Sequence, residues 1–170
     1  MAEKIDVTAV DAADLVRYAG LWYEIGRLPL LQEPTDGADV TAEYTLQDDG
    51  TVRVDNRSFD GDARPRQAVG VARPTGGAFS RLKVSFLPQA LRWLPFTEGD
   101  YWVLKIDPDY TVALVGTPDR KHLWLLSRTP RLSGEVESEF LMEAQRQGFD
   151  LSGWIHTLQT GGRVTDDMVE

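Results

Sequence analysis

The chain has 170 residues, a formal net charge of −9 at pH 7 and no cysteine. This length suits one domain with a sizeable core. The lack of cysteine excludes disulfides, thiolate metal ligands and a lipidated cysteine within this sequence. The acidic charge argues against nucleic acid as a partner, because phosphates favour basic surfaces.

The location of the protein is only partly indicated by the sequence. No apolar run is long enough to span a bilayer as a helix, and the first six residues lack the apolar core of a signal peptide. We therefore expect a cytoplasmic protein or, if a signal preceding Met1 was removed, a protein of the cell envelope or periplasm.

Most of the chain has the pattern of short strands. After a short helix at 12–18 and a first strand at 22–28, apolar and polar residues alternate over 40–46, 51–58 and 80–86. Further strands are expected at 66–72, which is rich in small residues, and at 101–106, 111–117 and 122–128. Turn sequences such as Asp49-Gly50 separate them. No helix is interleaved, which favours an antiparallel sheet. Eight such strands can close into an up-and-down barrel with room for one small ligand.

A helix is expected after the last barrel strand. Segments 111–116 and 123–126 are apolar on both faces, so they need cover outside the barrel. Segment 133–147 has an apolar stripe at helical spacing, with Ser133 as N-cap and Gly148 at its end. A short closing strand at 151–158 follows. The predicted organisation is a barrel with a C-terminal helix over 1–160 and a flexible tail over 161–170.

Three motifs together resemble the signatures of the lipocalin family, in the branch of the bacterial lipocalins and apolipoprotein D. They are Gly20-Leu21-Trp22 before the first strand, Asp107-Pro108-Asp109-Tyr110 at a turn, and Arg128 at the end of the last strand. The resemblance covers about 14–159. It implies an all-β barrel closed at one end, with Trp22 in the floor and Arg128 over its indole ring. Bacterial members are typically lipoproteins, and the missing cysteine departs from that pattern.

A carrier of this kind would hold its ligand on the inward faces of the strands. Trp124 shares the parity of Arg128 and matches a pocket tryptophan in apolipoprotein D. Glu24, Tyr44 and Asn56 are polar among apolar neighbours, so they either orient a head group or bond one another. The predicted ligand-binding residues are Glu24, Tyr44, Val54, Asn56, Val84, Phe86, Trp102, Leu104, Trp124 and Leu126.

The predicted function is binding and transport or storage of a small lipophilic ligand, either a fatty acid or a lysophospholipid. A sterol, isoprenoid or tetrapyrrole is the alternative ligand. A protein-interaction domain and a cryptic esterase are alternative functions. Catalysis is disfavoured because neither His122 nor His156 has a partner at metal-binding spacing and no nucleophile motif appears. No cofactor and no metal site is predicted.

One loop has an unusual composition. It contains Pro88 and Pro95 and carries the apolar side chains Leu87, Leu91, Trp93, Leu94 and Phe96, too many for an ordinary solvated loop. The loop could act as a lid over the mouth, as the contact of a homodimer, or as a peripheral membrane contact. Our hypothesis is that it has a contact role beyond a lid, either with a membrane or in a dimer. The sequence therefore leaves a monomer and a homodimer both open.

Overall fold

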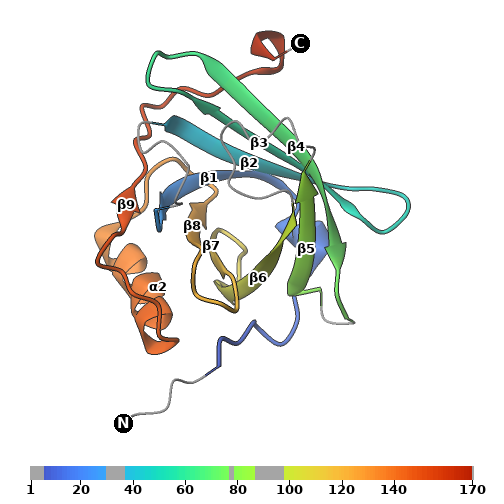
Figure 1. Cartoon of the computed structure of the whole chain (residues 1–170), viewed down its shortest axis with the longest axis vertical. Coiled ribbons are helices and arrows are strands. Elements are labelled where there is room, and N and C mark those ends of the chain that lie inside the picture. Colours follow the sequence, from blue (N-terminus) through green and yellow to red (C-terminus); the bar gives the residue numbers. More distant parts are fainter. Residues whose placement is uncertain (1–5, 30–36, 77–78, 87–97, 170) are drawn as a thin grey trace.

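The computed structural model describes residues 6–29, 37–76, 79–86 and 98–169, and the other residues form the thin grey trace in Figure 1. The predicted lid or contact loop, with Leu87, Leu91, Trp93, Leu94 and Phe96, lies outside the described residues.

Eight antiparallel strands close into a barrel, which confirms the predicted fold class (Figure 1). The strands are β1 (Gly20–Arg27), β2 (Ala38–Leu46), β3 (Val52–Phe59), β4 (Pro65–Pro74), β5 (Arg81–Phe86), β6 (Glu98–Ile106), β7 (Val112–Gly116) and β8 (Leu123–Ser127). Each strand from β1 to β8 pairs with the next one along the chain, and β1 also pairs with β8. The pairing of β1 with β8 closes the sheet, so neither of these strands has an unpaired edge there.

Two apolar clusters hold the domain together, one inside the barrel and one outside it. The inner cluster includes Trp22, Val54 and Leu126. The outer cluster lies between the barrel and α2 (Gly134–Arg146), where Phe140 and Ala144 are buried. The helix packs on β6 and β7, and the Ser133 side chain accepts a hydrogen bond from the backbone N–H of Val136 at 3.3 Å. The predicted helix, its cap and its position outside the barrel are therefore confirmed.

The orientation predicted for two side chains of β6 is wrong. Trp102 and Leu104 belong to the outer cluster, whereas Val103 belongs to the inner one. The ladder between β6 and β7 shifts register between Val103 and Lys105, so a bulge breaks the strict alternation. Both faces of β6 are apolar because α2 covers the outer face, and alternation alone cannot tell which face points inward.

The barrel is completed near one end by the segment that follows α2. The short strand β9 (Ile155–His156) pairs with the end of β1, within the longer closing strand predicted at 151–158. The Gln159 side-chain amide donates to the backbone carbonyls of Glu24 at 2.9 Å and Val40 at 3.0 Å, so it joins β1 to β2. A Cβ on Gly26 would lie 2.6 Å from the Trp154 ring, which explains the glycine at this contact.

The C-terminal segment packs on the barrel, in contrast to the flexible tail predicted for 161–170. Val164 is only 1% exposed. The Arg57 guanidinium donates to the Val164 carbonyl at 3.3 Å and pairs with Asp166 at 2.8 Å. Arg57 is itself held by the buried carboxylate of Asp55 at 3.0 Å. Figure 1 shows this last segment, in red, running past the end of β3.

Candidate functional site: the inner wall of the barrel

The floor of the barrel is sealed by Trp22 under Arg128. Trp22 is fully buried, and the Arg128 Cζ atom lies 3.8 Å from the centre of its ring. The same guanidinium donates to the backbone carbonyls of Arg17 at 2.7 Å, Leu21 at 3.0 Å and Tyr110 at 3.1 Å. The floor predicted from the resemblance is therefore present, and it is fastened to three separate segments.

The segment before β1 covers this floor from below. Its short helix α1 (Leu15–Tyr18) is capped by Asp14, whose carboxylate accepts from the Val16 N–H at 3.0 Å. The Arg17 guanidinium lies 4.4 Å from the centre of the Tyr110 ring, and the Tyr110 hydroxyl accepts from the Asp14 N–H at 2.9 Å. The predicted turn motif therefore serves the closed end of the barrel.

Three tyrosine hydroxyls meet just above the floor. The Tyr101 hydroxyl donates to that of Tyr44 at 2.8 Å and is also bonded to that of Tyr18. Burial raises the pKa of all three tyrosines, so the hydroxyls stay protonated. The cavity beside them is about 10 Å³. Since a lipid needs far more room, Tyr44 is part of the floor, and a ligand would lie nearer the other end.

Around and beyond the tyrosines the inner wall is mainly apolar, and Val84 lines the same small cavity as they do. Val54, Val84, Phe86 and Leu126 all belong to the inner cluster, as predicted. Asn56 pairs with Ala42 and Ala68 on the neighbouring strands, so it faces inward with them. Trp124 packs against the same cluster and is only partly buried, like Asn56. Of the ten predicted ligand contacts, only Trp102 and Leu104 point to the outside of the barrel.

A pair of charged side chains lies on the inner wall, beside Leu126 and Trp124. Glu24 pairs with Leu126, and Arg27 pairs with Trp124, on the β1–β8 ladder. Arg27 Nη1 lies 3.3 Å from Glu24 Oε2, and the Thr157 hydroxyl donates to the same oxygen at 2.6 Å. Burial raises the pKa of the Glu24 carboxyl, although Arg27 and Thr157 act against that shift.

Among the inward-facing residues that the sequence prediction missed, Tyr101, Arg27 and Tyr18 carry polar groups. Tyr101 was missed because the wrong face of β6 was assigned to the interior. Arg27 was missed because a register shift lies between Glu24 and Gly26, which turns Arg27 inward three residues after Glu24. Tyr18 lies before the first strand, where no strand period applies. The one sequence feature that links Tyr18 to the floor is its position four residues before Trp22. At this spacing the Trp22 indole N–H donates to the Tyr18 carbonyl at 2.8 Å.

The two histidines have separate surroundings. His156 bonds to Glu137 of α2 at 2.8 Å, outside the barrel. His122 stacks on Trp124 with ring centres 5.8 Å apart, and burial lowers its pKa. Within the described ranges, no group of three or more His, Asp or Glu side chains is arranged to hold a metal ion. None of the described helices is long and apolar enough to cross a membrane.

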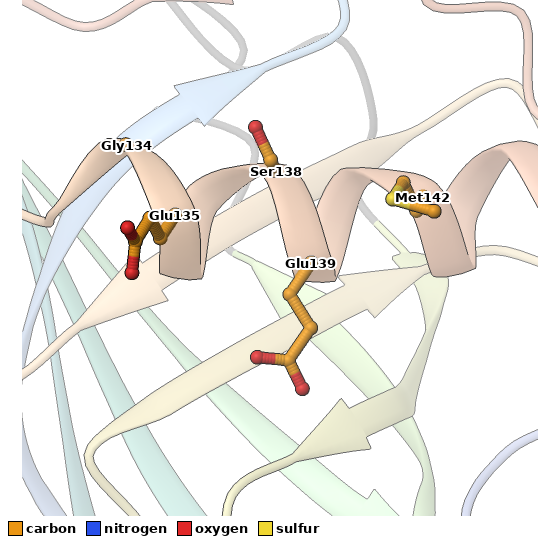
Figure 2. A pocket seen from close by; sticks show the side chains of 5 residues that line it. All are labelled: Gly134, Glu135, Ser138, Glu139 and Met142. Carbon is orange, nitrogen blue, oxygen red and sulfur yellow. The ribbon is translucent and has the colours of Figure 1, made fainter.

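A shallow hollow on the exposed side of α2 is a second concave surface. Gly134, Glu135, Ser138, Glu139 and Met142 line it, and Figure 2 shows that their side chains spread along the helix without converging on one point. Glu139 pairs with Lys105 at 3.5 Å, and Met142 is 66% exposed. This open surface offers no enclosed apolar volume, so the inner wall of the barrel is the better candidate site.

A closed antiparallel barrel with an apolar inner wall, a sealed floor and one flanking helix defines a class of proteins that bind small hydrophobic ligands inside the barrel. The chain belongs to the lipocalin family, because residues 13–159 match the model of the lipocalin-like domain. The expected family is thereby confirmed.

Relatives from bacteria, plants and animals share this similarity. The chain is 44% identical over 158 residues to "Outer membrane lipoprotein Blc" of Escherichia coli (strain K12), covering 91% of this chain and 84% of that protein. It is 40% identical over 155 residues to "Temperature-induced lipocalin-1" of Arabidopsis thaliana, covering 89% and 82%. It is 29% identical over 127 residues to "Apolipoprotein D" of Bos taurus, covering 72% and 65%. These relatives place it in the branch of the bacterial lipocalins and apolipoprotein D.

Solved structures support the same fold. Insecticyanin from the tobacco hornworm Manduca sexta has a TM-score of 0.67 at 23% identity, covering 99% of this chain and 89% of that chain. Apocrustacyanin C1 has a TM-score of 0.67 at 13% identity, covering 94% and 93%. At these identities the likeness concerns the fold alone.

Proposed function

We propose that this protein binds one single-chain lipid, a fatty acid or a lysophospholipid, inside the barrel and carries or stores it. The observation that supports this most directly is the arrangement of the inner wall. Apolar side chains such as Val54, Val84 and Leu126 line it between a sealed floor and a partly exposed Trp124. An acyl chain fits such a wall because it is long, thin and apolar.

The free energy available to such a ligand is ample. Burying a methylene group contributes about 0.8 kcal/mol, so an acyl chain of about sixteen carbons gains on the order of 12 kcal/mol. The costs of association and of ordering the chain reduce this gain considerably. Micromolar affinity, which corresponds to about 8 kcal/mol, stays within reach.

In this proposal the protein is a carrier and has no catalytic role, since its two histidines lie in separate surroundings. We place it in the cell envelope, as the name of its Escherichia coli relative, an outer membrane lipoprotein, suggests.

The test is mass spectrometry of lipids extracted from the purified protein, followed by titration of the delipidated protein with palmitic acid and a lysophosphatidylcholine. One lipid per chain, rebinding with micromolar affinity or better, would support the proposal. Retention of a sterol, isoprenoid or tetrapyrrole instead would keep the carrier function and change the ligand. Failure to rebind any of these would contradict the carrier function.

A further inference from the structure

The charged pair Glu24–Arg27 faces the interior of the barrel. Directly opposed residues on an antiparallel ladder project from the same face of the sheet. Glu24 is opposite Leu126 and Arg27 is opposite Trp124, and both partners pack in the inner cluster. The bulge between Glu24 and Gly26 is what brings two residues three positions apart onto one face.

Stability alone is a weak explanation for this pair. Glu24 is 5% exposed and Arg27 is 2% exposed, so both charges have lost most of their water. A buried ion pair seldom stabilises a fold more than apolar side chains of the same size would, because desolvation offsets the attraction. Placing these two charges on an otherwise apolar inner wall therefore costs desolvation free energy. This cost points to a role of the pair in binding.

The position of the pair along the barrel fits one end of a lipid. Strand β1 starts at the floor with Trp22, and Arg27 follows five residues later. At about 3.3 Å per residue, this places the Arg27 backbone roughly 16 Å along the strand from that of Trp22. The Val54 and Val84 side chains belong to the apolar wall of the same interior. A single-chain lipid with its tail toward the floor would have its polar group near Arg27.

We propose that Arg27 recognises the anionic oxygens of the ligand's head group, a carboxylate or a phosphate, and that Glu24 positions the guanidinium for this contact. The proposal rests on the proposed lipid-binding function. A guanidinium is a planar fork of N–H donors that matches the oxygens of carboxylates and phosphates. The Thr157 hydroxyl donates to the same Glu24 oxygen at 2.6 Å, so the carboxylate is held beside Arg27 by a second contact.

Glu24 also sets how strongly the site prefers an anion. Its negative charge lies 3.3 Å from the guanidinium and repels an incoming anionic head group. The Glu24→Gln variant keeps the shape and the contact with Thr157 but removes that charge. This variant should bind an acid more tightly relative to a neutral lipid of the same length, which is a second signature of the same arrangement.

The experiment compares three ligands with the same C14 chain, namely myristic acid, 1-tetradecanol and myristoyl lysophosphatidylcholine. Their affinities for the delipidated full chain are measured at pH 7.5. The double variant Glu24→Gln/Arg27→Gln removes both charges of the pair, and Arg27→Lys retains the positive charge. Arg81→Gln is the matched control, because Arg81 lies over Trp102 on the outside of the barrel. Thermal unfolding establishes that each variant is folded.

For the wild-type protein we expect tighter binding of the acid than of the alcohol. In the double variant the ratio of acid to alcohol affinity should fall roughly 10-fold or more, the loss typical of a charge-assisted hydrogen bond. Arg27→Lys should restore part of the ratio, Glu24→Gln should raise it, and Arg81→Gln should leave it unchanged. If the double variant loses affinity for myristic acid alone, the head group that Arg27 recognises is a carboxylate. If it loses affinity for the lysophospholipid alone, the head group is a phosphate.

The proposal is overturned if the double variant changes the affinities for acid, alcohol and lysophospholipid by the same factor, because Arg27 would then serve packing only. It is also overturned if Glu24→Gln leaves the ratio unchanged, a test that keeps Arg27 in place. If the wild-type protein binds all three lipids without preference, this inference fails and the proposed function stands. If it binds none of them, the proposed function fails as well.

Discussion

The Arg128 guanidinium lies 3.8 Å above the centre of the Trp22 ring, and it joins the end of β8 to the start of β1. Both residues also make hydrogen bonds to backbone carbonyls, so the contact fixes the chain before β1 as well as the ring. Gly20 is needed at this point, since its φ of +105° disfavours other residues and a Cβ would lie 3.3 Å from the Arg128 guanidinium. This relationship closes one end of the barrel.

We expect Trp22→Ala to lower the free energy of unfolding by about 3–5 kcal/mol, because it opens a large cavity in a closed core. Arg128→Ala should also destabilise the protein, while sparing ligand affinity. Arg81→Ala is the control, since Arg81 lies 4.4 Å from the centre of the Trp102 ring on the outer surface and should contribute less than about 1 kcal/mol. Urea unfolding measures all three. Equal stability of the Arg128 and Arg81 variants would contradict the role of the floor.

A lipid in the barrel should change the fluorescence of Trp124, which faces the interior and is partly buried. In Trp124→Phe most of the response to palmitic acid should disappear. Trp102→Phe should keep the response, because Trp102 packs in the outer cluster. If the response is instead lost in Trp102→Phe and kept in Trp124→Phe, the ligand binds outside the barrel.

The turn at Asp107 should make stability depend on pH. Partial burial raises the pKa of its carboxyl, but hydrogen bonds from the Thr111 hydroxyl and from the backbone N–H groups of Thr111 and Val112 outweigh this and lower the pKa below the usual 3.8. A depressed pKa in the folded state gives stabilisation that is present above the unfolded pKa and is lost as the pH falls through the folded pKa.

Asp107→Ala should therefore lower the free energy of unfolding by about 1–2 kcal/mol at pH 7. The gap between variant and wild type should narrow as the pH falls below 3.8. Asp109→Ala, at an exposed position of the same turn, is the matched control. A gap that stays constant between pH 7 and pH 3 would show that the loss in Asp107→Ala is unrelated to its charge.

The packed C-terminal segment gives a further prediction. Val164→Ala should cost about 1–2 kcal/mol, since two methyl groups leave a buried site. Met168→Ala should change stability little, because Met168 is 44% exposed. Thermal or urea unfolding compares the two variants. A Val164→Ala variant as stable as wild type would mean that this segment is a loose tail in solution.

The barrel could be predicted from the sequence because each pattern that indicates it involves residues close together in the chain. Alternation and turn residues indicate strands, and the apolar stripe that ends in Ala144 indicates the covering helix. The residues of the inner wall were harder to predict from the sequence. In β6 both faces are apolar, so the inward positions of Tyr101 and Val103 depend on where α2 packs. Arg27 turns inward through a bulge, and a bulge depends on pairing with a distant strand. The burial of Val164 is likewise a long-range contact.

The most direct test of a ligand inside the barrel is cross-linking with a palmitic acid analogue that carries a photoactivatable diazirine at the middle of its chain. After irradiation of the loaded full-length protein, peptide mass spectrometry locates the modified residues. We predict adducts on inward-facing residues such as Phe86, Trp124 and Leu126, and their loss when unlabelled palmitic acid competes. Adducts confined to the outer surface of α2, around Met142, would contradict an internal site.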